Sequence, residues 1–165
     1  MIEPRQLRDV VIVPTLIALE MYSDAAVALL LGTCAQESQM GRFLRQLGAG
    51  PARGIWQMEP ATHDDLWDNY LAYQPELASK IRDLMSHGVF KSGEKAALHR
   101  ELATNLAYAC AMARVHYRRI KAPLPAADDI AGLAAYWKRF YNTPLGAGTE
   151  EEFRRNWAAY VEAYL

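Results

Sequence analysis

The chain has 165 residues, a length that suits one domain able to bury a hydrophobic core. Hydrophobic residues make up 52% and charged residues 22% of the chain, which excludes a disordered protein. The formal net charge of −1 argues against nucleic acid as a partner, because a nucleic-acid-binding surface needs a basic field. We therefore expect one globular domain over residues 1–165.

The first part of the chain predicts helices. Residues 4–13 carry an apolar helical pattern, and Pro14 must kink or restart this helix because proline has no amide donor. Ser23 or Asp24 is expected to cap the next helix, which ends near Glu37. The buried stripe of that helix is formed by Val27, Leu30, Leu31 and Cys34. From Gly41 onward this periodicity is lost, and glycines and a proline predict a loop or small β element over residues 41–57.

The second part also predicts helices, so the expected fold class is mainly α. A capping pair is expected to start one helix at Thr62, and a polar connection is expected over residues 87–95. A single long helix is predicted over residues 97–120. Asp128 or Asp129 should cap the following helix, and the last helix should begin at a capping box of Thr149 and Glu152.

Glu37 is the candidate catalytic residue. Helical spacing places it on the apolar stripe that includes Leu30 and Cys34, where loss of water disfavours a charged carboxylate and raises its pKa. It also lies in the last helical turn, where the negative end of the helix dipole acts in the same direction. A carboxyl group protonated near neutral pH can donate a proton to a leaving oxygen. The alternative is a solvent-exposed glutamate at a frayed helix end.

Two motifs resemble those of soluble lytic transglycosylases and goose-type lysozymes. Residues 37–38 read Glu-Ser and residues 54–62 read GIWQMEPAT. That family carries a catalytic Glu-Ser at a helix end, then a Gly-Leu-Met-Gln-like segment that leads into Pro-x-Thr. Ile55 and Trp56 stand here in place of the usual Leu and Met. The resemblance extends over most of residues 30–142.

A third motif matches less well. Residues 133–136 read Leu-Ala-Ala-Tyr and resemble the start of the family's Ala-Tyr-Asn motif, whose tyrosine bonds the catalytic glutamate and whose asparagine touches the sugar. Tyr136 matches the tyrosine, but Trp137 stands where the asparagine is expected. A Tyr-Asn pair follows at Tyr141 and Asn142. The expected contacts are therefore either redistributed or made by a rebuilt helix end.

The resemblance implies a lysozyme-like domain that cleaves the β-1,4 bond between N-acetylmuramic acid and N-acetylglucosamine in peptidoglycan. In the lytic transglycosylase version, Glu37 acts as acid and then as base, and the product is a 1,6-anhydro ring. The alternative enzyme is a hydrolytic goose-type lysozyme, with a water placed by Asp64, Asp65 or Glu59. The alternative of another class is a non-catalytic structural or adaptor protein of a phage particle.

The residues expected to bind the glycan by this resemblance are Ser38, Gly54, Gln57, Tyr136 and Asn142. The lack of a side chain at Gly54 would let the backbone approach the sugar, and the amide of Gln57 suits an N-acetyl or hydroxyl group. Trp56 is either a core aromatic or a stacking platform for a sugar ring.

We expect no cofactor and no metal site, because none of the four histidines pairs with another His or Cys at metal-ligand spacing. Cys34 and Cys110 are expected to be buried thiols, with a disulfide between them left open. The apolar run over residues 10–19 lacks the features of a signal peptide and is too short to span a membrane. A wall-cleaving enzyme of this kind would reach its substrate after lysis or by delivery, as in a bacteriophage lysozyme carried on the virion.

Overall fold

The computed structural model describes residues 1–142 and 146–164. Helices account for 69% of the structure, and the described residues form no sheet, which confirms the mainly α fold class. The α-helices, in chain order, are α1 (Pro4–Gln6), α2 (Val13–Ala18), α3 (Asp24–Ser38), α4 (Pro60–Asn69), α5 (Pro75–Asp83), α6 (His87–Ser92), α7 (Lys95–Thr104), α8 (Leu106–Arg118), α9 (Ile130–Trp137) and α10 (Glu150–Tyr160). Short π- or 3-10-helical turns are η1 (Leu7–Ile12), η2 (Leu47–Ala49), η3 (Leu71–Tyr73), η4 (Lys138–Asn142) and η5 (Glu162–Tyr164).

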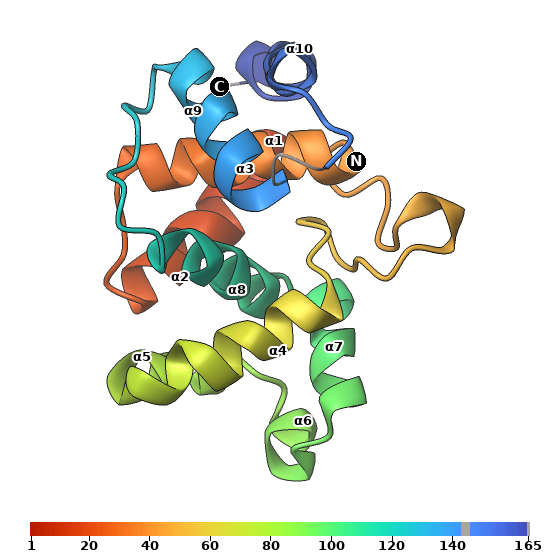
Figure 1. Cartoon of the computed structure of the whole chain (residues 1–165), viewed down its shortest axis with the longest axis vertical. Coiled ribbons are helices and arrows are strands. Elements are labelled where there is room, and N and C mark those ends of the chain that lie inside the picture. The colour runs from red at the N-terminus through yellow and green to blue at the C-terminus, as the bar shows by residue number, and fades with distance from the viewer. Residues whose placement is uncertain (143–145, 165) are drawn as a thin grey trace.

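Helix α8 lies between α3 and α9 on one side and α4 and α5 on the other (Figure 1), and it contributes to two hydrophobic cores. One of its faces, with Ala113 and Tyr117, packs into the core formed with α3, α9 and α10. The opposite face, with Met112 and Val115, packs into the core formed with α4 and α5. Every residue of α8 from Tyr108 to Tyr117 is buried. This central helix therefore joins the two halves of the molecule.

Most helix ends form where the sequence predicts them. The hydroxyl of Ser23 accepts a hydrogen bond from the amide of Ala26, at 3.1 Å, and so caps α3. Asp129 caps α9, and Thr149 and Glu152 form the expected capping box of α10. Pro14 falls in the first turn of α2, directly after the π-helical η1, so its missing amide breaks no helical hydrogen bond there.

Three predicted boundaries are wrong. The predicted helix over residues 97–120 is broken at Asn105, whose side chain accepts from the Tyr108 amide at 3.1 Å and starts α8 afresh. The expected connection over residues 87–95 contains α6. Helix α4 begins at Pro60 rather than Thr62, because proline suits a first helical turn in which no amide donor is needed.

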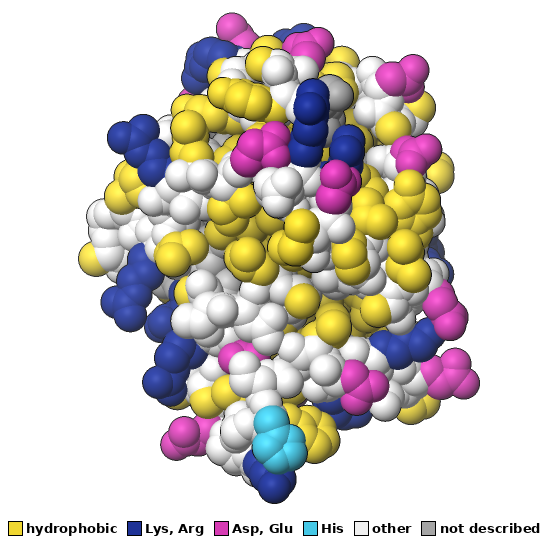
Figure 2. Space-filling model, turned by 180° about the vertical axis from the view of Figure 1, so that it is seen from behind, with side chains coloured by type: hydrophobic (Ala, Val, Ile, Leu, Met, Phe, Trp, Pro, Cys, Tyr) yellow, Lys and Arg dark blue, Asp and Glu magenta, His cyan; other side chains and the backbone are white. Residues whose placement is uncertain are grey.

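The segment between α3 and α4 is a loop with little regular structure. Its described residues contain the short turn η2 and two isolated β-bridges, Arg45 with Arg53 and Arg53 with Met58. On the face drawn in Figure 2, acidic and basic side chains are interspersed among apolar ones. No helix among the described residues combines the length and the hydropathy needed to cross a bilayer.

Candidate active site

Helix α3 ends abruptly just after Glu37. Three consecutive residues, Gln39, Met40 and Gly41, adopt left-handed backbone conformations with φ of 50°, 57° and 76°. The amides of Gln39 and Met40 turn back to the last carbonyl groups of the helix. The chain therefore leaves the helix in one turn, and Glu37 stays at its edge.

Ser38 ties the helix end to the GIWQ segment. Its hydroxyl donates to the carbonyl oxygen of Ile55 at 2.6 Å and accepts from the amide of Gly41 at 2.8 Å. The residue is only 1% exposed, so its side chain holds the loop in place and does not face the cavity. The structure thus places Ser38 where it supports the end of α3 and the GIWQ segment, outside the lining of the cavity.

The carboxyl group of Glu37 is partly buried and accepts one hydrogen bond, from the indole Nε1 of Trp137 to Oε1 at 2.8 Å. Burial raises the pKa of Glu37 to about 7, although the bond from Trp137 acts in the opposite direction. Among the residues that the structure describes, no lysine or arginine pairs with this carboxyl group. Both protonation states of Glu37 are therefore populated near neutral pH, which suits a group that first donates and then accepts a proton.

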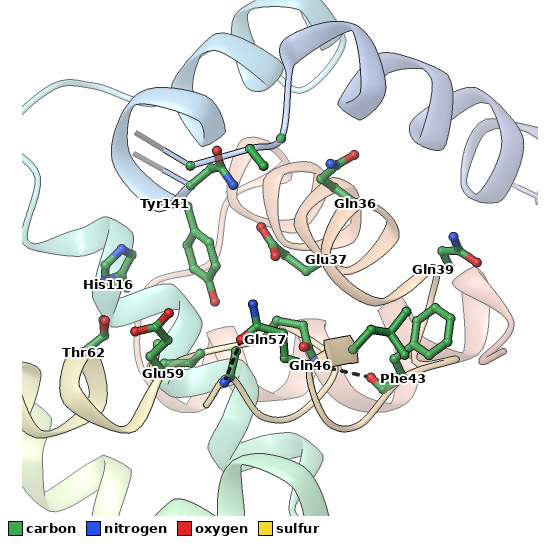
Figure 3. A pocket seen from close by; sticks show the side chains of 17 residues that line it. Gln36, Glu37, Gln39, Phe43, Gln46, Gln57, Glu59, Thr62, His116 and Tyr141 are labelled. Carbon is green, nitrogen blue, oxygen red and sulfur yellow. Dashed lines mark hydrogen bonds between the residues drawn. The ribbon is translucent and has the colours of Figure 1, made fainter. Parts of the chain in front are cut away.

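Glu37 lies on the wall of a cavity of about 760 Å³ (Figure 3). The cavity is bounded by the end of α3, by the loop that precedes α4 and by η4. Five side-chain amides line it, those of Gln36, Gln39, Gln46, Gln57 and Asn142. This volume is within the range of small-ligand sites, and the many amides favour a ligand rich in hydroxyl and amide groups.

The hydrogen bonds that the amides make within the protein leave a defined pattern for a ligand. The amide oxygens of Gln36, Gln39, Gln46 and Asn142 each accept a bond from another residue. Gln57 differs from these four, because it uses its NH₂ group within the protein: its Nε2 donates to the carbonyl oxygen of Gly54 at 2.7 Å. Within the described part of the chain, four amide NH₂ groups and the oxygen of Gln57 are thus left without a protein partner.

Tyr141 connects η4 to the GIWQ segment from within the cavity. Its hydroxyl donates to the carbonyl oxygen of Trp56 at 2.6 Å, and its ring lies between His116 and Glu37 in Figure 3. Burial and the nearby Glu37 carboxylate raise the pKa of Tyr141 well above its usual value, so it remains a neutral hydroxyl. Tyr141 and Asn142 both line the cavity, so the Tyr-Asn pair of η4 lies at the site.

Tyr136 lies elsewhere, so the expectation that it contacts Glu37 is wrong in this structure. Its hydroxyl donates to the carbonyl oxygen of Ala122 at 3.0 Å, and it lines a different, smaller pocket beside Arg114. The next residue, Trp137, donates to Glu37 instead. Trp137, the residue at which the sequence departs from the Ala-Tyr-Asn motif, is therefore the one that bonds the carboxyl group of Glu37.

Gly54 and Trp56 support the site without lining the cavity. Gly54 has a φ of +75°, and a Cβ atom there would lie 1.8 Å from the carbonyl oxygen of Leu102. The absence of a side chain thus serves contact with α7, rather than the expected approach to a sugar. Trp56 is 1% exposed and donates from Nε1 to the carbonyl oxygen of Leu30 at 2.9 Å, so it is a core aromatic and not a stacking platform.

The second carboxylate in the cavity is Glu59. Its side chain is exposed and approaches from the loop wall, across from Glu37 (Figure 3). Asp64 and Asp65, expected as alternatives, do not line the cavity. Asp65 is paired with Arg119, and Asp64 bonds two histidines and Lys95.

Sequence reasoning missed Trp137 and His116, and it also missed three amides of the cavity wall, Gln36, Gln39 and Gln46. Trp137 was recognisable only as a departure from a motif, and nothing in the sequence pointed to His116. The His116 ring lines the cavity and donates from Nε2 to the carbonyl oxygen of Phe140 at 2.9 Å. Burial lowers its pKa to about 4, so the ring is neutral at neutral pH.

Comparison with protein-family profiles, with curated proteins and with solved structures finds no match. The assignment of a function therefore depends on the residues and geometry of the cavity and on the motif resemblance.

Proposed function

We propose that the protein cleaves the glycan strands of peptidoglycan at the β-1,4 bond between N-acetylmuramic acid and N-acetylglucosamine, as a lytic transglycosylase. The observation that carries the proposal is a carboxyl group, Glu37, with a pKa near 7 on the wall of an amide-lined cavity. A carboxyl group of this kind is the proton donor that glycoside cleavage requires. The Glu-Ser and GIWQMEPAT motifs support the same function.

In this reaction, the protonated Glu37 donates its proton to the bridging oxygen as the bond from that oxygen to C1 of the muramic residue breaks. The resulting carboxylate then accepts the proton of the muramic C6 hydroxyl. The C6 oxygen bonds to C1, which closes the 1,6-anhydro ring and returns Glu37 to its starting state. No water is consumed, so one carboxyl group is sufficient.

The amide pattern of the cavity supports this choice of substrate. The NH₂ groups of Gln36, Gln39, Gln46 and Asn142 can donate to sugar hydroxyl or N-acetyl oxygens. The oxygen of Gln57 can accept from the N–H of an N-acetyl group. Tyr141 holds the GIWQ segment and Trp137 holds the carboxyl group of Glu37. Fixed positions of these two parts support a single position for the scissile oxygen.

One observation favours a second candidate, the hydrolytic lysozyme reaction. Glu59 lines the same cavity as Glu37, from a different wall, and a second carboxylate can activate a water molecule. In that reaction, water replaces the C6 hydroxyl as the nucleophile and the product has a reducing end.

The test is mass spectrometry of the fragments released from purified peptidoglycan. Anhydro-muramic ends, absent with Glu37→Gln, are the expected result. Reducing ends that disappear in both Glu37→Gln and Glu59→Gln would instead establish hydrolysis. If the folded wild-type protein binds peptidoglycan but releases no fragment, the proposal of an enzyme fails and a non-catalytic, glycan-binding role replaces it.

Glu59→Gln is the matched control for Glu37→Gln, because both replace an acid of the same cavity by its amide. A transglycosylase needs only Glu37, so Glu59→Gln should keep anhydro products. Each variant must first show the cooperative unfolding curve of a folded protein, so that a loss of activity cannot come from a loss of structure. Full activity of a folded Glu37→Gln protein would overturn the assignment of the catalytic acid.

A further inference from the structure

A cluster of ionisable side chains lies away from the cavity, between α4 and α7. His63 and Asp64 come from the first turns of α4, and His99 comes from α7. One carboxylate oxygen of Asp64 lies 3.0 Å from Nδ1 of His63 and 2.8 Å from Nε2 of His99. One nitrogen or oxygen atom from each of the three residues lies within 4.8 Å of the other two.

These atoms are of the kinds that bind divalent transition metals. Imidazole nitrogen and carboxylate oxygen suit Zn²⁺, with bonds of about 2.0–2.2 Å. Neighbouring ligand atoms of a tetrahedral ion with such bonds are roughly 3.3 Å apart. The two separations from Oδ1 of Asp64, 3.0 and 2.8 Å, are close to this value, and the ligand atoms of the two histidines lie within 4.8 Å of each other, so side-chain shifts of about 1–2 Å would close the site.

The surrounding residues hold the His63 ring in one orientation. Its Nε2 lies 2.7 Å from the hydroxyl of Tyr108, which also accepts a bond from Nε1 of Trp67 at 3.0 Å. Since His63 is 1% exposed, the ring cannot turn freely, and its Nδ1 stays directed at Asp64. Such outer contacts are typical of metal-binding histidines, whose second nitrogen is held by a polar partner.

We propose that His63, Asp64 and His99 bind one divalent transition-metal ion of the Zn²⁺ class, which joins α4 to α7. The site supplies three protein ligands, and water can complete the tetrahedron. Sequence spacing did not reveal it, because His99 approaches the other two ligands only through the packing of α4 and α7 on α8.

Lys95 is the group that competes with an ion. Its Nζ lies 3.2 Å from the second oxygen of Asp64 and 3.8 Å from a carboxylate oxygen of Asp68. The Lys95 side chain is 65% exposed, so it can move toward Asp68 when an ion occupies the site. Removing its charge should therefore strengthen metal binding.

The proposed ion would act on the wall of the cavity. Helix α4 follows directly after Glu59, and Leu102 of α7 contacts Gly54. Joining these two helices would stiffen the segment that carries Gln57. The metal site does not depend on the proposed cleavage reaction, since it uses other residues and can be tested without substrate.

The experiment is a calorimetric titration of Zn²⁺ into the full chain, free of any polyhistidine tag. The expected result is one equivalent bound, with a rise in melting temperature. His99→Gln should weaken binding by at least about tenfold, because it removes a ligand. His99 is 17% exposed, so this variant is expected to fold, which its circular dichroism spectrum must confirm.

Two further variants make the test specific. His87→Gln, which changes an exposed histidine of α6, should leave the affinity unchanged. Lys95→Met should tighten binding by about fivefold, as removal of a charge beside a ligand implies. The proposal is overturned if wild-type protein binds no Zn²⁺, if His99→Gln binds as tightly, or if Lys95→Met binds no more tightly than wild type.

Discussion

The indole Nε1 of Trp137 donates a hydrogen bond to Oε1 of Glu37, at 2.8 Å. Trp137 is completely buried, and its ring lies 5.5 Å from that of Phe153, centre to centre, so the donor is held in place. The ionised carboxylate is the stronger acceptor of this bond, which therefore lowers the pKa of Glu37 while burial raises it. The balance of the two effects keeps the group able to titrate near neutral pH.

Trp137→Phe removes the donor and keeps most of the aromatic packing. We expect the pKa of Glu37 to rise by roughly one unit, as the loss of a hydrogen bond to a charged group implies. Because a general acid works only while protonated, the alkaline limb of the kcat/KM profile should move to higher pH. Carboxyl titration by NMR measures the same change without substrate.

The control for this variant is Trp67→Phe, which removes an indole bond to Tyr108 outside the cavity. It should leave the alkaline limb in place. A shift of the Trp137→Phe limb to lower pH would contradict the effect that we assign to the bond.

Glu37→Gln should stabilise the protein at high pH. The folded carboxyl group has a pKa of about 7 against a usual value of 4.5, so it holds its proton after the unfolded chain has released it. The free energy of unfolding of the wild type therefore falls as pH rises from about 4.5 to 7, by about 3 kcal/mol in total. The variant lacks this loss.

Urea unfolding of both proteins at pH 4 and at pH 8 measures this difference. The gain in stability from Glu37→Gln should be larger at pH 8 than at pH 4, by about 3 kcal/mol. Titration of buried His116 affects both proteins alike and cancels in the comparison. An equal gain at the two pH values would show that Glu37 ionises at its ordinary pKa.

Tyr141→Phe and Tyr136→Phe form a matched pair that tests which tyrosine serves the site. Each variant removes one hydroxyl that donates to a carbonyl oxygen, Trp56 for Tyr141 and Ala122 for Tyr136. Each should lower the free energy of unfolding by about 1–3 kcal/mol. Only Tyr141→Phe should reduce glycan cleavage, by on the order of tenfold, and comparable losses of activity in both would count against the site described above.

Gly54→Ala should destabilise the protein severely. An added Cβ would lie 1.8 Å from the carbonyl oxygen of Leu102, and the φ of +75° disfavours alanine as well. Gly48→Ala is the matched control, because Gly48 has the same φ but nothing within 4 Å of the added atom. Thermal unfolding should show a loss of about 1 kcal/mol for Gly48→Ala and at least about 3 kcal/mol for Gly54→Ala. Similar losses of unfolding free energy in the two variants would mean that the α7 backbone moves away from the added Cβ at little cost.

Sequence reasoning located most of the helices and the place of Glu37 at the end of one of them, because both depend on local patterns. The apolar stripe of α3 and the capping residues Ser23 and Thr149 depend on residues close together in the sequence. They can therefore be recognised before the three-dimensional structure is known. The break at Asn105 was missed because apolar residues continue on both sides of it. The break is visible only in the structure, where the Asn105 side chain accepts a bond from the Tyr108 amide and donates one to the carbonyl oxygen of Leu84.

The partners of Glu37 were not predictable from the same patterns. The motif predicts Tyr136 at the site, but neighbouring residues of α9 point in directions about 100° apart, and the π-helical turn η4 follows only after Trp137. Tyr141, which belongs to η4, lines the cavity. Of the two α9 residues, Trp137 bonds Glu37 from the core and Tyr136 faces another pocket. Contacts between residues distant in sequence, such as Glu37 with Trp137, depend on helix packing that no local pattern encodes.

The left-handed turn at residues 39–41 has a consequence for how this chain can vary. Because successive residues of an α-helix are rotated by about 100°, inserting or deleting one residue in α3 would rotate its buried stripe relative to the end that carries Glu37. The three left-handed residues and the Ser38 bond to Ile55 fix the helix end in space, so the extra residue could not be absorbed there. Substitutions along α3 change its packing gradually, whereas a change in its length should set the whole buried stripe against the fixed position of Glu37 in a single step.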